Sequence, residues 1–371
     1  MLRNSYRQRL KAVQVSMKTD MALYTDYLLS SFGQATATGL SALLDKAVSH
    51  DDVSRFVSHL DSGSKALWEQ VKPSVRAAEK ELAKEAAGLL VLDDTIIEKT
   101  YTDENGLVTV HYDHSKDRYV KGITLVSALL VLGSVVLPVA YELVVKTLRC
   151  GIKDKKEVWR SEKTKNEMFR NMVSACVKNS LRFSYVLCDS WYTNAENIKH
   201  VLGLKKHLIG AVKSNLEVAL SLQDKKAGKF IKLNQLALEL GLKQVYIRQQ
   251  QVPVSLCKDV FINEDGSKAV QYLICTDLTL SFQQITTTYQ KRWSVEEYHK
   301  SLKQNAAIAK APVKTSNTQA NHLFASICAF IKLERLKISN NLNHFALKSK
   351  LYLKATQAAF YEIAQLKLNL A

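Results

Sequence analysis

Three acidic residues lie where carboxylates could hold metal ions. Asp93 ends the apolar run 88–93 and Asp189 ends the apolar run 183–189, and both runs have the length and composition of buried strands. Glu296 follows in a segment with helical spacing. Phosphoryl transfer by two Mg²⁺ ions, roughly 3.5 to 4 Å apart, needs such a set of hard oxygen ligands on a rigid scaffold. We therefore predict that Asp93, Asp189 and Glu296 are catalytic and bind Mg²⁺, or Mn²⁺ in its place.

A second group of chemically active side chains surrounds Glu296. On one continuous helix turning about 100° per residue, Glu296 shares a narrow face with Tyr289, Arg292 and Lys303. Glu297 points about 100° away from its neighbour, and this geometry favours Glu296 as the metal ligand. The two cations and the phenol on that face are predicted to bind the phosphates and bases of DNA. The opposite face, which we expect to be packed, carries Val295, Tyr298 and Leu302.

The first acid is followed directly by another, Asp94. Neighbouring residues of a strand point to opposite faces, and the Asp-x-Thr spacing to Thr95 favours Asp93 as the ligand. The acids also have purely structural alternatives, since Asp93 could cap a turn and Asp189 could begin a loop. Glu296 could pair with a lysine one turn later on the same helix. The shared spacing of all three acids makes the catalytic interpretation the stronger one.

The order of the expected elements predicts an α/β fold with an RNase H-like catalytic core. Three closely spaced strands, a helix, a strand, a helix and a further strand follow one another, and in such a fold the first and fourth strands lie side by side. The predicted regions are 1–85, helical; 86–214, the first part of the core; 215–277, a β-rich insertion; 278–310, the helix with Glu296; and 311–371, helical.

Three short motifs together resemble those of a known family. Tyr289, Arg292, Glu296 and Lys303 match the pattern Tyr-x2-Arg-x3-Glu-x6-Lys. Residues 90–95 (LVLDDT) and 187–192 (LCDSWY) resemble the family's first and second acidic motifs. The chain is similar over about residues 85–310 to the Y-R-E-K insertion-sequence transposases, the insertion-sequence-four-like clade of bacterial DDE transposases.

This resemblance implies cut-and-paste DNA transposition, with cleavage at transposon ends and strand transfer into target DNA. It also implies a homodimer on double-stranded DNA that carries terminal inverted repeats, and a role for the helical region 1–85 in recognising the DNA ends. Some members of the clade stack a flipped base on a Trp of the insertion, but none of the four Trp residues here lies in 215–277. We expect Trp191 and Trp293 to be buried packing residues. Two rival functions are an RNase H-like nuclease or resolvase, and a non-catalytic DNA-binding relic.

The composition fits a nucleic-acid partner. Lys and Arg number 52 against 35 Asp and Glu, which gives a net charge of +17, and basic clusters lie at 3–11, 146–165, 225–232 and 300–354. A field of this sign attracts polyanions such as DNA.

The six Cys residues form no CxxC pair, and the N-terminus lacks the apolar core of a signal peptide. Both features suit the reducing cytoplasm, where a bacterial transposase would associate with the nucleoid. The uncharged stretch 123–141 is rich in Val, and Gly133 and Ser134 interrupt it. We therefore expect two buried strands there and no membrane span.

Overall fold

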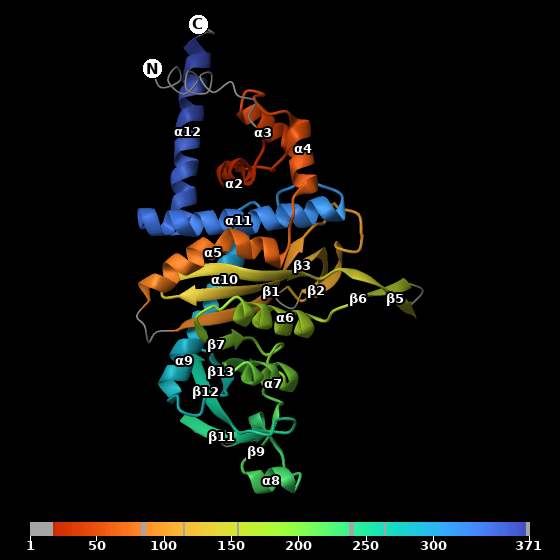
Figure 1. Cartoon of the computed structure of the whole chain (residues 1–371), viewed down its shortest axis with the longest axis vertical. Helices are drawn as coiled ribbons and strands as arrows, with labels where there is room; N and C mark the ends of the chain where they lie inside the picture. Colours follow the sequence, from red (N-terminus) through yellow and green to blue (C-terminus); the bar gives the residue numbers. More distant parts are fainter. Residues whose placement is uncertain are drawn as a thin grey trace. The chain divides into compact units, whose positions relative to one another are not determined.

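The computed structural model describes residues 18–82, 87–113, 116–153, 156–236, 241–262 and 265–368. As far as it describes them, the residues form two compact units (Figure 1). Unit 1 combines Met1–Ala66, Tyr101–Asn105 and Lys300–Ala371, and unit 2 combines Leu67–Thr100 and Gly106–His299. The helical ends of the chain thus belong to one unit, whereas the sequence suggested two separate regions.

Unit 2 is built on an 11-stranded mixed sheet. Its central strands are β1 (Gly88–Glu98), β2 (Thr109–Asp113), β3 (Arg118–Leu132), β4 (Val135–Leu143), β7 (Phe183–Cys188) and β8 (His207–Val212). β1 pairs antiparallel with β3 and parallel with β7, and β7 pairs parallel with β8. This is an RNase H-like arrangement, and the expected contact between the two acid-bearing strands, β1 and β7, is confirmed.

The uncharged stretch forms strands, as its Val content predicts. β3 and β4 are joined by a two-residue turn at Gly133 and Ser134, and Leu132 pairs with Val135. Gly133 has a φ of +61°, which glycine adopts without steric cost in this kind of hairpin. β3 is buried from Gly122 to Leu132. Among the described helices, none is long and apolar enough to cross a membrane.

β1 is longer than its apolar run suggested. The strand continues for five residues beyond Asp93, with pairing from Leu89↔Val131 through Glu98↔Gly122. The β-branched residues Thr95, Ile96 and Ile97 favour this extended backbone. Asp93 therefore lies in the middle of a central strand, which corrects the expected strand end. Asp189, by contrast, directly follows the last residue of β7, as predicted.

Helices flank the sheet of unit 2. They are α5 (Ser64–Glu81, mostly in this unit), α6 (Lys165–Lys178), α7 (Ala195–Gly203), α9 (Phe282–Gln290), η2 (Lys291–Trp293) and α10 (Ser294–Gln304, which continues into unit 1). α6 packs on β3 and β4, α7 on β8, and α9 on β8 and on β12 (Val254–Ile262). The helix starts follow local rules: Thr164 and Glu167 form a capping box at α6, and Asn194 caps α7.

The segment around Glu296 is not one continuous helix. The 3-10 turn η2 separates α9 from α10, and because it turns about 120° per residue, three such residues rotate the following face by about 60° relative to an α-helix. The continuous helix expected for Tyr289, Arg292, Glu296 and Lys303 is therefore wrong, although Arg292 still lies 3.7 Å from Glu296. The packed face of α10 is confirmed, since Val295, Tyr298 and Leu302 are buried.

The β-rich character predicted for 215–277 is confirmed. This region contains β9 (Glu217–Ala219), α8 (Leu222–Lys226), β10 (Ile231–Lys232), η1 (Leu233–Gln235), β11 (Gly241–Ile247), β12 (Val254–Ile262) and β13 (Lys268–Cys275). Its strands extend the central sheet, because β13 pairs antiparallel with β8. One further pair, β5 (Lys146–Lys153) and β6 (Lys156–Ser161), forms a separate two-stranded sheet that the sequence did not predict.

Unit 1 is helical. Its helices are α2 (Met21–Ser30), α3 (Ala37–Leu43), α4 (His50–His59), α11 (Ser316–Asn340) and α12 (His344–Leu368). α11 packs on α2 and α4, and the Tyr24 hydroxyl lies 3.1 Å from His322 Nδ1 in this buried contact. The predicted helices of 1–85 are confirmed for the described part, and residues 1–17 lie outside it.

Candidate active site

Asp93 lies on β1 and Asp189 directly follows the adjacent parallel strand β7, which brings them together although 95 residues separate them in the sequence. The pairs Leu90↔Val186 and Val91↔Leu187 align the two strands just before the acids. Asp189 is held by the loop that follows it, because its Oδ1 accepts the backbone N–H groups of Trp191 at 3.0 Å and Tyr192 at 3.3 Å.

Burial disfavours the charged form of both carboxylates. Burial, followed by the negative charge of Asp189, raises the pKa of Asp93 from 3.8 to about 7. Burial likewise raises the pKa of Asp189. Two partly desolvated acids in this position form a site that a cation would stabilise.

Arg292 supplies a positive charge at this site. Its Nη1 donates to Asp93 Oδ2 at 2.8 Å, and its Nη2 lies 3.7 Å from Glu296 Oε1. Burial lowers the pKa of Arg292, but the surrounding phenol and carboxylates outweigh this effect and raise the pKa above its ordinary value. The guanidinium therefore remains charged and links Asp93 to Glu296, whose side chain is 43% exposed.

Tyr289 is buried, with 6% of its surface exposed. Its hydroxyl donates to the carbonyl oxygen of Cys188 at 3.2 Å, and its ring centroid lies 5.9 Å from the guanidinium carbon of Arg292. Tyr289 thus ties the end of α9 to the last residue of β7, directly before Asp189. Lys303 is exposed in the last turn of α10 and belongs to unit 1.

Asp94 has different partners. Lys165 Nζ lies 3.0 Å from each of its carboxylate oxygens, and the buried Tyr192 hydroxyl donates to Oδ1 at 2.6 Å. Burial, together with the charge of Asp94, raises the pKa of Tyr192, so this phenol keeps its proton. These contacts engage Asp94 with α6 and the loop after β7, while Asp93 contacts the arginine beside Glu296. The geometry favours Asp93 over Asp94 as the partner of Glu296.

The donor set fits a hard divalent cation in part. Asp93 and Asp189 offer carboxylate oxygens, which such cations prefer, and burial, together with neighbouring carboxylates, raises their pKa values. In the described part of the chain, no group of three or more His, Cys, Asp or Glu residues is arranged to hold a metal. Glu296 is connected to Asp93 through Arg292, so it would complete a ligand set only if this guanidinium moved.

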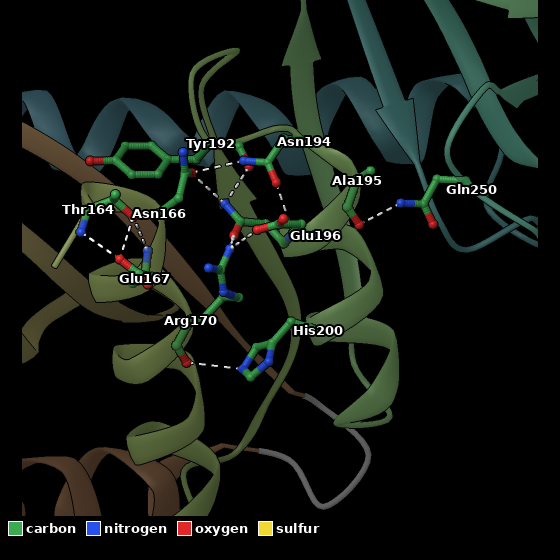
Figure 2. Close-up of polar contacts among 11 residues, drawn as sticks. Thr164, Asn166, Glu167, Arg170, Tyr192, Asn194, Ala195, Glu196, His200 and Gln250 are labelled. Carbon is green, nitrogen blue, oxygen red and sulfur yellow. Dashed lines mark hydrogen bonds and ion pairs between the residues drawn. The ribbon is translucent and has the colours of Figure 1, made fainter.

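A buried network of amides holds the loop after Asp189, and motif analysis did not find it (Figure 2). Asn197, which is 0% exposed, donates from Nδ2 to the Tyr192 carbonyl at 2.9 Å and to Asn166 Oδ1 at 2.8 Å. Asn194 Nδ2 also donates to Asn166 Oδ1, and Arg170 donates to Asn197 Oδ1, both at 2.9 Å. The Asn-x-x-Asn spacing at the start of α7 was the available sequence signal, because Asn is a common helix cap.

Trp191 and Trp293 are 49% and 65% exposed, so the expectation that they are buried is wrong. Lys165 Nζ lies 5.1 Å from the ring centroid of Trp191, an attractive cation–π arrangement. A shallow pocket of about 460 Å³ lies next to Trp191, and Lys213 and Gln249 also line it. Beside this pocket, Gln250 Nε2 donates to the Ala195 carbonyl at 2.6 Å, and this hydrogen bond joins the β-rich insertion to α7 (Figure 2).

Comparison with known families identifies the class of protein. Residues 12–228 match the family model described as DDE superfamily endonuclease. Because this match spans more than half of the 371 residues, the chain belongs to the DDE superfamily endonucleases. Members of this superfamily act on DNA and generally use divalent metal ions. The match includes Asp93 and Asp189 and ends before Glu296. A search of curated proteins gave no match.

Proposed function

We propose that this chain is a DNA transposase of the Y-R-E-K, insertion-sequence-four-like clade, which cleaves DNA at transposon ends and transfers the strands into target DNA. The observation that carries the proposal is the placement of Asp93 on β1 and of Asp189 directly after the neighbouring strand β7, with Arg292 joining Asp93 to Glu296 at 2.8 and 3.7 Å. The family membership supports the reaction class.

In this proposal Asp93, Asp189 and Glu296 hold Mg²⁺, or Mn²⁺ in its place. When bound, the metal would activate the attacking oxygen and stabilise the leaving oxygen. Arg292 has a separate task, since a guanidinium binds phosphate as well as carboxylate. A DNA phosphate would draw Arg292 away from Asp93 and free that carboxylate for metal binding.

The remaining motif residues have different surroundings. Lys303 is exposed and suits contact with DNA phosphates. Tyr289, also predicted to bind DNA, has its hydroxyl engaged by Cys188 and is nearly covered. We therefore assign Tyr289 to positioning Arg292 and β7, and leave direct DNA contact to Arg292 and Lys303.

The proposed partners are double-stranded DNA with terminal inverted repeats and a target DNA, bound by a homodimer in the bacterial cytoplasm at the nucleoid. The net charge of +17 supports a polyanionic partner. Residues 1–85, which form α2 to α5 in their described part, are proposed to contribute to recognition of the transposon ends.

The test is cleavage of labelled DNA that carries the candidate terminal repeats, with Mg²⁺ or Mn²⁺. Glu296→Gln should abolish cleavage and leave DNA binding largely intact. Glu297→Gln is the matched control, because Glu297 is the exposed neighbour on the same helix and should cleave normally. Cutting that persists in Glu296→Gln would refute the assignment.

The second candidate is a nuclease or resolvase that cuts without joining, because the matched family is described as an endonuclease. Incubation of a 3′-ended donor with plasmid distinguishes the two, since only a transposase inserts the donor. Binding without any cutting would instead favour a non-catalytic relic, against which the three intact acids argue.

A further inference from the structure

The two-stranded sheet of β5 and β6, called the ribbon below (residues 146–161), has no packed face in its described part. Residues 147–151 and 159–160 are all exposed, and within the described chain its strands pair only with each other. Figure 1 shows the ribbon projecting away from α6 and the central sheet of unit 2. An isolated two-stranded ribbon is only marginally stable, so a surface that covers it would stabilise it.

Each face of the ribbon carries one arginine and one apolar side chain. Leu148 lies opposite Arg160, and Arg149 lies opposite Trp159. Opposed residues share a face and successive residues alternate, so the two pairs lie on opposite faces. Leu148 is 46% and Trp159 44% exposed. Exposed apolar groups beside cations form a surface that suits DNA, where phosphates flank apolar sugars and bases.

The positive charge of the ribbon and the residues that follow it indicates what kind of partner it binds. Residues 146–165 contain eight Lys or Arg against three Asp or Glu. A second copy of the ribbon would carry the same positive charge and would be repelled, whereas duplex DNA would be attracted. The major groove of B-DNA also has room for a two-stranded ribbon. We propose that the ribbon binds duplex DNA, with Arg149 and Arg160 on phosphates and Leu148 and Trp159 against the groove wall.

The ribbon is anchored close to the candidate active site. Lys146 donates from its backbone N–H to the Gly106 carbonyl at 2.7 Å and from Nζ to the Val110 carbonyl at 3.0 Å. Its other strand ends at Ser161, and α6 begins four residues later with Lys165, which binds Asp94 beside Asp93. DNA on the ribbon would therefore lead toward the carboxylates. This inference rests on the proposed function for the identity of DNA as substrate.

Cys150 gives a direct measurement, because it is exposed on β5 and the other five cysteines are buried. The full-length Glu296→Gln variant is treated with a thiol-reactive dye, with and without a short duplex DNA. We expect the DNA to slow modification of Cys150 several-fold, and Cys150→Ser to show no fast-reacting thiol. An unchanged rate at saturating DNA would overturn the proposal.

A second measurement tests the arginines. The double variant Arg149→Gln, Arg160→Gln should bind duplex DNA more weakly, with a smaller salt dependence: the slope of log K against log salt should fall by about 1 for each phosphate that the protein no longer binds. The double variant Lys178→Gln, Lys199→Gln removes the same charge from exposed positions on α6 and α7 and should keep both slope and affinity. Equal effects of the two double variants would show that only net charge matters and would refute the ribbon site.

Thermal unfolding of each variant checks that these exposed substitutions leave the fold intact. The outcomes also separate the two proposals. Protection of Cys150 by DNA, together with a wild-type protein that never cuts the repeat DNA, would support the ribbon and refute the transposase. Cutting without protection of Cys150 would support the transposase and refute the ribbon.

Discussion

Replacing Asp93 with Asn should stabilise the protein while it abolishes cleavage. The Asp93 side chain is only 13% exposed, and burial and the charge of Asp189 raise its pKa from 3.8 to about 7. A carboxyl whose pKa is raised by folding binds its proton more tightly in the folded state, so stability falls as the pH rises from the unfolded pKa toward the folded one. Asn keeps the shape of the neutral acid and removes this penalty.

The size of the effect follows from the same pKa values. At 1.36 kcal/mol per pKa unit, a rise from 3.8 to about 7 corresponds to at most about 4 kcal/mol. Relaxation of the site would reduce this figure, and we expect Asp93→Asn to raise the free energy of unfolding by roughly 2 to 4 kcal/mol above pH 7. Near pH 4 the difference should vanish, because the wild-type carboxyl is then protonated in the folded state.

Urea unfolding at pH 4 and pH 8, without divalent metal, measures the difference directly. Asp103→Asn, at an exposed position, is the control and should leave the free energy of unfolding unchanged at both pH values. If Asp93→Asn were less stable than wild type at pH 8, the contact with Arg292 would outweigh burial and the repulsion from Asp189. The interpretation of the site as short of positive charge would then be wrong.

Three further substitutions test the parts that position the site. Asn197→Ala should lower the free energy of unfolding by about 2 to 3 kcal/mol in a urea titration, because it leaves buried hydrogen-bond partners unsatisfied. Tyr289→Phe should lower the free energy of unfolding by about 1 kcal/mol, because it removes the hydrogen bond to Cys188. DNA affinity in a binding titration should stay unchanged. A large loss of affinity would instead indicate that Tyr289 contacts DNA directly. Gly210→Ala would place a Cβ 2.1 Å from Thr193 Oγ1 and so displace the loop that contains Thr193. This displacement should lower the cleavage rate, and it should lower the free energy of unfolding by about 1 to 3 kcal/mol.

Buried strands were the most predictable part of the fold. The runs that form β3, β4 and β7 are apolar and β-branched, and their burial gives a strong sequence signal. Adjacency of β1 and β7 followed from the order of elements, because an RNase H-like sheet allows few arrangements. The extent of β1 was missed, since its second half is only partly buried and carries polar residues.

The ribbon and the exposed Trp residues could not be predicted in this way. A ribbon whose described side chains are mostly exposed needs no alternation between apolar and polar residues, so β5 and β6 resemble a charged loop in the sequence. Trp191 looks like a core residue by type, and only the structure of the loop after Asp189 turns it outward. The 3-10 turn at 291–293 was also invisible, because the residues on either side keep helical spacing.

The placement of Arg292 connects the stability of the site to its proposed activity. Two largely buried carboxylates, one on β1 and one directly after β7, cost stability whenever both are charged, and a guanidinium 2.8 Å from Asp93 offsets part of this cost. The same guanidinium occupies one carboxylate oxygen of Asp93, and Glu296 is connected to Asp93 only through Arg292. A DNA phosphate that competes for Arg292 would remove the offset at the moment the substrate arrives, and the site would then gain affinity for a divalent cation. Binding of DNA and binding of metal should therefore strengthen each other, because each relieves a charge imbalance that the other creates.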